Sequence, residues 1–237
     1  LFLYDHLGGR EKLPGSEGIH LNHHVAGAPL VTGMKKAFIY SDCWVQDARL
    51  VVLNAMDARN RGAVIRVGTE CVSARREGDL WSVAVRDSAG EHTIKARSLV
   101  NAAGPWCAEI LEKRVEAKKK QGIRMVQGSH IVVPKLFDHD YYYIFQNPDG
   151  RIVFAIPYEQ DFTLIGTTDR DYEGDPSKVA ISSDEISYLC ELANTYFAHK
   201  IAPADVVWSY SGVRPLYGDG TFTAAKSPPI ANWPNQR

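Results

Sequence analysis

The second half of the chain contains long segments in which apolar and polar residues alternate, and this pattern limits the folds open to it. Alternation with a period of two places successive side chains on opposite faces and predicts half-buried β-strands. The predicted strands are residues 122–134, 141–146, 151–157, 162–167 and 206–212. The Asn-Pro-Asp-Gly sequence at 147–150 predicts a hairpin turn. An antiparallel sheet is therefore expected, and residues 15–45 are expected to belong to the same sheet.

One helix is predicted within this half. Ser182 and Glu185 form a capping box, which is typical of a helix N-terminus. An apolar face follows with helical spacing, at Ile186, Leu189, Ala193, Tyr196 and Phe197. A sheet covered by a helix predicts an α+β domain. From about Thr221 the periodicity ends and prolines gather, so residues 221–237 are expected to form an irregular tail.

The first half has a different order of elements. A helix is predicted over residues 48–60, capped by Asp47 and ended by Gly62, and residues 1–8 are typical of the end of another helix. Strands are predicted at residues 63–67, 71–76, 80–87 and 91–96, followed by a buried strand at 98–104. Pro105 is expected in the first turn of the next helix. This order predicts an antiparallel ribbon inserted in an α/β domain.

Composition excludes several classes of function. The formal net charge of -1 argues against a nucleic-acid-binding protein, which would carry a basic excess. No apolar run approaches the roughly 20 residues that a membrane-spanning helix needs. The four cysteines include no C-x-x-C pair, so no metal site is expected and reduced thiols are favoured.

Two segments carry residues suited to ligand binding. Asn101-Ala102-Ala103-Gly104-Pro105-Trp106 ends a predicted strand in small residues, so a ligand can approach the backbone and helix amides can face an anion. A tight turn is the alternative. Arg214 lies behind a glycine and before a proline, which fixes its direction. Its guanidinium suits a phosphate or carboxylate, or it pairs with a nearby acid.

Two further segments offer groups for acid–base chemistry or polar contacts. His130 stands before an apolar run and can act as a general base, or it is a satisfied core side chain. The hydroxyls of Thr167 and Thr168 follow Gly166 and can line a pocket, or they stabilise a turn.

Together these segments resemble the aerobic, flavin-dependent glycerol-3-phosphate dehydrogenases. The matching blocks occur in the order of that family and cover most of the chain up to about Gly218. They are YSDCW at 40–44, DARL at 47–50, SARR at 73–76, LVNAAGPW at 99–106, GSHIVVP at 128–134, IGTTD at 165–169 and WSYSGVRPL at 208–216. Each block alone is weak, and their shared order makes the resemblance specific.

The resemblance implies oxidation of sn-glycerol 3-phosphate to dihydroxyacetone phosphate, with FAD as cofactor and a quinone as electron acceptor. It implies a cytoplasmic enzyme held peripherally on the inner face of the cytoplasmic membrane, and a homodimer when complete. Residues implied to lie against the FAD are Asn101, Ala102, Ala103, Gly104 and Trp106, with Cys71 and Val72 near its adenosine half. Arg214 would bind the substrate phosphate, and His130 and Thr168 would line the substrate pocket. His130 is the candidate base.

The sequence also departs from that family. Its 237 residues contain neither the G-x-G-x-x-G turn that binds the FAD pyrophosphate nor the later glycine-glycine-lysine segment and C-terminal helical domain. A central fragment is therefore expected, inactive and weak in FAD binding by itself, with residues 224–237 of different origin. The expected divisions are a substrate-domain start with a connecting helix (1–46), a partial FAD-binding lobe (47–112), the substrate-domain sheet (113–220) and the tail (221–237).

Two alternatives stay open. A flavoenzyme of the glycine-oxidase or amino-acid-oxidase type would share the ribbon and the Asn-Ala-Ala-Gly turn, and Arg214 would then hold a carboxylate. A flavin-free interaction module would keep the same scaffold without the chemistry.

Overall fold

The structure is a computed structural model that describes residues 5–6, 13–115, 122–147 and 150–218. Contacts divide the chain into two compact units. The first comprises Leu1–Gly18, Phe38–Ala102 and Glu109–Lys118, and the second comprises Ile19–Ala37, Ala103–Ala108 and Lys119–Arg237. Helices combine with antiparallel sheets, so the predicted fold class is confirmed. The predicted tail, and the helix expected at residues 1–8 except for Asp5 and His6, lie outside the described residues.

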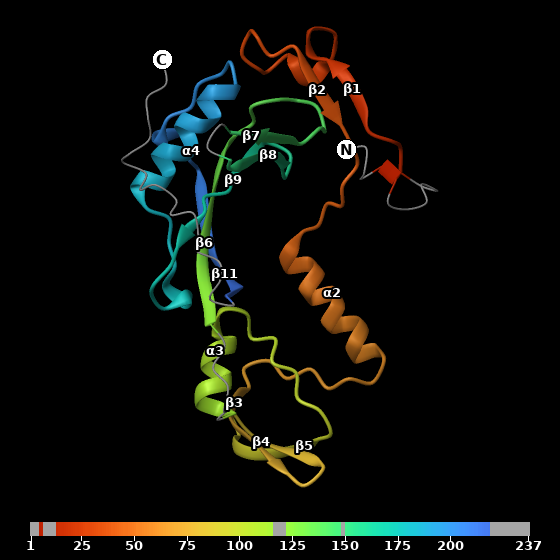
Figure 1. Ribbon diagram of the computed structural model, residues 1–237, viewed down its shortest axis with the longest axis vertical. Coiled ribbons are helices and arrows are strands. Elements are labelled where there is room, and N and C mark those ends of the chain that lie inside the picture. Colours follow the sequence, from red (N-terminus) through yellow and green to blue (C-terminus); the bar gives the residue numbers. More distant parts are fainter. Residues whose placement is uncertain (1–4, 7–12, 116–121, 148–149, 219–237) are drawn as a thin grey trace. The chain divides into compact units, whose positions relative to one another are not determined.

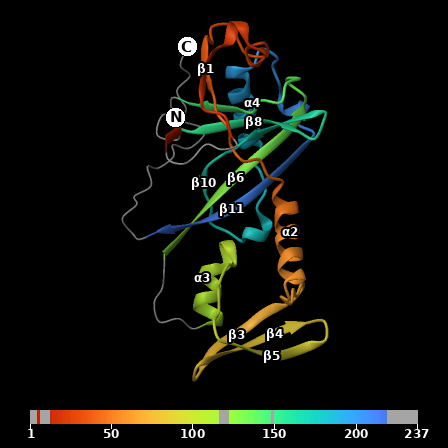
Figure 2. The same cartoon turned by 90° about the vertical axis from the view of Figure 1, so that its right-hand side faces the viewer.

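The second unit is built on a six-stranded antiparallel sheet. The strands are β6 (Gly122–Pro134), β7 (Tyr143–Gln146), β8 (Ile152–Tyr158), β9 (Phe162–Gly166), β10 (Arg170–Asp171) and β11 (Trp208–Gly218). β6 is the longest, and it pairs with β9, β10 and β11, while the sheet continues from β9 through β8 to β7. Figures 1 and 2 show β6 and β11 running side by side. The predicted strands and the β7–β8 hairpin are confirmed.

β11 is longer than its sequence pattern predicted. It continues to Gly218, past the expected end at residue 212, because β6 offers a backbone partner along that whole length. Pro215 lies within it, opposite Met125. Proline is tolerated there because β11 pairs only with β6 among the described strands, and a strand with one neighbour leaves its other edge without ladder bonds.

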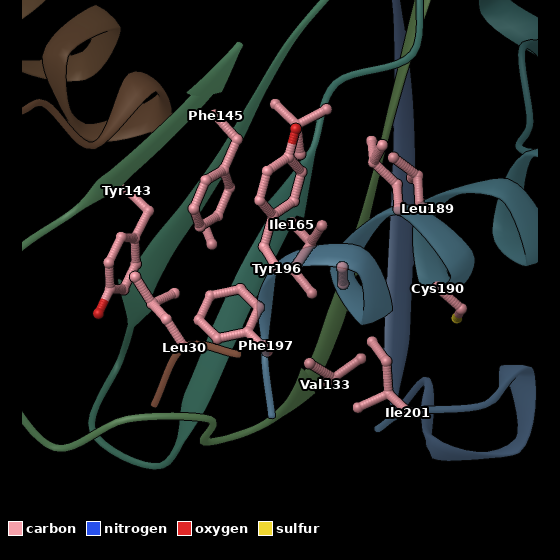
Figure 3. Close-up of a cluster of buried hydrophobic side chains, with 14 of the residues drawn as sticks. Leu30, Val133, Tyr143, Phe145, Ile165, Leu189, Cys190, Tyr196, Phe197 and Ile201 are labelled. Atoms are coloured by element: carbon pink, nitrogen blue, oxygen red, sulfur yellow. The ribbon is translucent and has the colours of Figure 1, made fainter. Parts of the chain in front are cut away.

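Helix α4 (Ser183–Tyr196) packs on this sheet (Figure 1). The Ser182 hydroxyl accepts from the Glu185 amide, and the Glu185 carboxylate accepts from the Ser182 amide, so the predicted capping box is confirmed. Leu189 and Phe197 are almost fully buried together with Ile131. Figure 3 shows Leu189 and Phe197 among the clustered side chains of this core. Two short 3-10 turns, η5 (Pro176–Lys178) and η6 (Pro203–Asp205), precede and follow α4 in the chain.

Residues 15–45 do not join the six-stranded sheet, contrary to the expectation. β1 (Glu17–His20) and β2 (Lys36–Ile39) pair with each other, and the 3-10 turns η1 (Leu21–His23) and η2 (Val25–Gly27) lie between them. A side-chain hydrogen bond and a short backbone bridge attach this segment to the larger core instead. The Tyr143 hydroxyl donates to the Ala26 carbonyl at 2.6 Å, and Leu30 forms an isolated bridge with Phe197.

The first unit contains helix α2 (Asp47–Asn60) and a three-stranded antiparallel ribbon. The strands are β3 (Glu70–Glu77), β4 (Leu80–Asp87) and β5 (Gly90–Ala96), which confirms the predicted ribbon. A small core of Ala74, Val83 and Val85 supports it. No residue of α2 is buried. Gly62 ends α2 as predicted, with a φ of 97° that favours glycine.

Three local predictions in the first half are wrong. Asp47 is the first helical residue and not the cap, because Gln46 occupies the cap position without a side-chain bond. Residues 63–67 and 98–104 are not strands, and Val100 is 84% exposed. A strand needs a neighbour for its backbone groups, and no described strand pairs with either segment.

A helical segment follows residue 103, as Pro105 predicted. It begins as the 3-10 turn η3 (Gly104–Trp106), passes through α3 (Cys107–Glu109) and ends as the π-helical turn η4 (Ile110–Arg114). Gly104 has a φ of 53°, a left-handed conformation that a residue with a side chain rarely adopts.

Candidate functional site

The candidate substrate residues lie where β6 pairs with β11. Because strand residues alternate between faces, Gly128 and His130 lie on the face opposite to Ser129. Ser129 faces the α4 side, since its hydroxyl donates to Glu185 at 2.9 Å. The register places Tyr210 opposite His130 and Gly212 opposite Gly128. This face of the sheet, away from α4, is called the site face below.

The His130 imidazole is held between two neighbouring strands. It stacks on the Tyr210 ring of β11, with centroids 4.9 Å apart and an interplanar angle of 8°. On the other side it covers Gly166 of β9, where an added Cβ would lie 2.2 Å from the His130 Cδ2 atom. Only glycine fits below the ring. His130 is half-buried on the site face and is not part of the core under α4.

Arg214 lies on the site face near Gly128. Its Nη2 atom is 3.5 Å from the position that a Cβ on Gly128 would take. The side chain is exposed, and no carboxylate in the described part of the chain forms an ion pair with it. The alternative of a structural pair with a nearby acid is therefore not found among the described residues. A guanidinium with donors available suits an anionic ligand.

Thr168, the predicted pocket residue, points toward the α4 side. It is 3% exposed, accepts a hydrogen bond from the Ser129 amide at 2.9 Å and donates to Glu185 at 2.8 Å. Thr167 takes the place near Arg214 instead. Its Oγ1 lies 2.8 Å from the position of a Cβ on Gly128 and donates to the Thr168 carbonyl at 2.9 Å. The pair of hydroxyls was predicted from the sequence, but the sequence does not show which of the two residues faces the site.

Glu185 is a buried carboxylate that sequence reasoning recognised only as a cap. It is 1% exposed and accepts hydrogen bonds from the side chains of Ser129, Thr168 and Gln127 as well as from Ser182. Ser129 and Thr168 are the neighbours of His130 and Thr167 in the chain. The carboxylate therefore fixes the backbone that carries the site face. The convergence of these four residues on one acid was not visible in the sequence, because they come from β6, from the segment after β9 and from the start of α4.

The predicted FAD residues are divided between the two units. Cys71, Val72, Asn101 and Ala102 belong to the first, while Ala103, Gly104 and Trp106 belong to the second, which also holds His130, Thr168 and Arg214. Within the first unit, the ladder is interrupted by a bulge at Val72. The Val72 carbonyl accepts from Arg114 Nη1 at 3.4 Å, and Arg114 Nη2 pairs with Glu70 at 2.8 Å. Within the second unit, η3 contacts β11.

Three further observations concern metal ligands, helix length and cysteine chemistry. No cluster of His, Cys, Asp and Glu with the arrangement of a metal site occurs among the described residues. The described helices include none that is long and apolar enough to cross a membrane. The four cysteines are reduced, and burial raises the pKa of the Cys190 thiol to about 11, which opposes a nucleophilic role.

Comparisons with known proteins agree with the sequence resemblance. Residues 9–235 match the family described as FAD dependent oxidoreductase. A glycerol-3-phosphate dehydrogenase from Pseudomonas aeruginosa is 53% identical over 92% of this chain and 42% of its own length. A D-erythritol 1-phosphate dehydrogenase from Brucella abortus is 49% identical over 93% of the chain and 44% of its length. The aerobic glycerol-3-phosphate dehydrogenase of Escherichia coli is 46% identical over 92% and 44%.

A solved structure shares the fold. The glycerol-3-phosphate dehydrogenase from Bacillus halodurans, complexed with FAD, aligns with a TM-score of 0.71 and 27% identity over 86% of this chain and 44% of that one. The chain thus spans less than half the length of each of these four relatives. The family match covers nearly all of its residues, and the chain therefore belongs to the FAD-dependent oxidoreductase family.

Proposed function

We propose that this chain is part of an enzyme that oxidises sn-glycerol 3-phosphate to dihydroxyacetone phosphate with FAD, and that it carries substrate-binding residues and part of the FAD site. One observation carries the proposal. On the site face, Arg214 and the half-buried His130 flank the facing pair Gly128 and Gly212. No carboxylate among the described residues forms an ion pair with Arg214. Oxidising a phosphorylated alcohol requires a group that binds the anion and a group that takes the proton, besides the hydride acceptor that FAD would supply.

The proposed chemistry uses each group in a defined role. Arg214 binds the phosphate, and the Thr167 hydroxyl orients the substrate near it. Oxidation of a secondary alcohol removes the hydroxyl proton and a hydride from the same carbon, leaving a carbonyl. His130 takes the proton on its imidazole, and the stacked Tyr210 ring keeps that imidazole over Gly166. The flavin, when bound, supplies the acceptor for the hydride.

Several residues fit a bound FAD. Asn101–Gly104 has only small or short side chains and none of its four residues is buried, so a ligand can approach it closely. A Cβ added to Gly104 would meet no atom within 4 Å. Asn101, Ala102, Ala103, Gly104 and Trp106 would hold the flavin half, and Cys71 and Val72 at the bulge would hold the adenosine half. The 47–112 and 113–220 segments would then be the flavin-binding and substrate-binding lobes.

The acceptor, location and assembly rest on the family resemblance alone. Electrons would pass from the flavin to a quinone, the enzyme would bind peripherally to the inner face of the cytoplasmic membrane, and it would assemble as a homodimer. Quinone reduction that depends on glycerol 3-phosphate tests the acceptor and the location. It is measured with the complete enzyme, in the membrane and soluble fractions of cells that contain it. Oxygen consumption in place of quinone reduction would contradict the acceptor.

A second substrate is favoured by one comparison. The relative from Brucella abortus is named for D-erythritol 1-phosphate and is nearly as similar as those named for glycerol 3-phosphate. Both compounds are phosphate monoesters of polyols, so Arg214 would serve either. Nuclear magnetic resonance titrations of the labelled chain with both compounds, and with glycine for the amino-acid oxidase alternative, rank the candidates. Preferential binding of glycine would overturn the proposal.

Arg214→Ala tests the phosphate contact. A hydrogen bond to a charged group typically contributes about 1.5–3 kcal/mol. The affinity of the chain for glycerol 3-phosphate should fall accordingly, while its weak affinity for glycerol should stay the same. Arg124→Ala is the matched control, because Arg124 lies on β6 with its charge already paired to Asp171 at 2.6 Å. Equal losses for glycerol and glycerol 3-phosphate would show that Arg214 does not bind phosphate.

A further inference from the structure

Gly128, Gly166 and Gly212 lie close to the candidate residues on the site face, and the structure explains two of these glycines. Gly166 lies beneath the His130 ring, and a Cβ on Gly128 would come within 2.8 Å of the Thr167 hydroxyl. Gly212 is different. A Cβ there would meet no atom within 4 Å in the described part of the chain, and its φ is outside the left-handed region. Neither packing nor backbone conformation within these residues calls for a glycine at 212.

A glycine inside a strand weakens the strand, and often marks a place where a ligand approaches the backbone. Gly212 is in the middle of β11, directly opposite Gly128. Thr167 and Arg214 lie over Gly128, whereas the described residues leave the backbone at Gly212 bare on the site face. Strand alternation puts Tyr210 and Arg214 on the same face, one on each side of Gly212 and about 7 Å away along the strand. His130 stacks on Tyr210.

We infer that Gly212 is a specificity-determining residue, and that the open space over it holds the carbon chain of a polyol phosphate between Arg214 and His130. This inference rests on the proposed function. The phosphate binds the guanidinium at one end of the space, and the carbon to be oxidised reaches the imidazole at the other. A methyl group on residue 212 projects into that space and excludes the polyol, but leaves the guanidinium open to a bare phosphate ion.

Gly212→Ala tests this without disturbing the fold, because the new methyl group meets nothing among the described residues. Binding of sn-glycerol 3-phosphate and of inorganic phosphate is measured by titration of the isotope-labelled chain. We expect Gly212→Ala to weaken binding of glycerol 3-phosphate at least tenfold and to change binding of inorganic phosphate less than twofold. Gly18→Ala is the matched control, since its Cβ would make an ordinary contact of 3.6 Å with Phe38 in β2.

The other possible results distinguish a failure of this inference from a failure of the proposed function. Unchanged glycerol 3-phosphate binding by Gly212→Ala overturns the inference and leaves the proposed function standing, provided that Arg214→Ala abolishes binding. Equal weakening for inorganic phosphate also overturns it, because the methyl group would then act on Arg214. A lower melting temperature for Gly212→Ala contradicts the open space itself. If the unaltered chain binds neither ligand through Arg214, the proposed function fails together with the inference.

Discussion

At the residue scale, a group of aromatic and histidine side chains fastens the N-terminal segment to β7. Tyr143 is the centre of this group, since its hydroxyl donates to the Ala26 carbonyl and therefore accepts from His139 Nε2 at 2.8 Å. The His24 Nδ1 atom accepts from the Ala26 amide at 3.1 Å. Both histidine rings lie edge-on to Tyr141. His24 directly, and His139 through Tyr143, thus hold the η2 turn in place.

This arrangement makes stability depend on pH. Burial, followed by the nearby His24, lowers the pKa of His139 below its ordinary value of 6.5. The unfolded chain therefore binds a proton more readily than the folded chain, so stability rises with pH in this range. The contribution of His139 to the free energy of unfolding should be complete above pH 6.5. It should decline as the pH falls toward the lower pKa that His139 has in the folded chain. Urea unfolding of the chain and of His139→Gln at pH 7.5 and 5.5 measures it. A midpoint difference between the two proteins that is the same at both pH values would contradict the prediction.

At the element scale, the N-terminus of α4 is joined to β6 through Glu185. Glu185→Ala removes the acceptor for buried donors on Gln127, Ser129 and Thr168, and each such loss typically costs about 1–3 kcal/mol. The free energy of unfolding should fall by about 3 kcal/mol or more. Ser182→Ala loses only the cap and should cost about 1 kcal/mol. Glu191→Ala, exposed on the same helix, is the control and should change stability by less than about 0.5 kcal/mol. A small effect of Glu185→Ala, similar to that of Glu191→Ala, would show that the carboxylate does not fix the strand.

Elements with local signals could be predicted from the sequence, and features that depend on contacts between distant segments could not. β6, the β7–β8 hairpin and α4 were predictable because alternation, turn residues and a capping box are local signals. Residues 63–67 and 98–104 have strand-like composition but no described partner, and pairing is a property of two segments. At the site, His130 and Arg214 were found by residue type. The outward position of Thr167, the stacking of Tyr210 and the buried bonds of Glu185 were not predicted, because only the register across three strands and a helix brings these residues to the others.

At the scale of the whole molecule, the two units have unequal cores. The second contains one large buried cluster, in which Ile131, Ile165 and Leu189 are fully buried. The first has a cluster of three small or medium side chains, and its helix α2 buries none of its residues. Apolar burial stabilises by roughly 25 cal/mol per Å² removed from water. The second unit should therefore hold most of the folding free energy.

Amide hydrogen exchange measures this difference directly. The slowest-exchanging amides should be those of β6 and β9, because they open only when the large core opens, while amides of β3, β4 and β5 should exchange faster.

Leu189→Ala creates a cavity in the large core, and such truncations cost about 2–5 kcal/mol. It should speed exchange in β6 and β9 by a corresponding factor, about 30-fold for 2 kcal/mol. The exposed Val207→Ala is the control and should leave these amides unchanged. Equal protection of the ribbon and of β6 in the unaltered chain would contradict the unequal cores, because exchange would then report one common unfolding of both units.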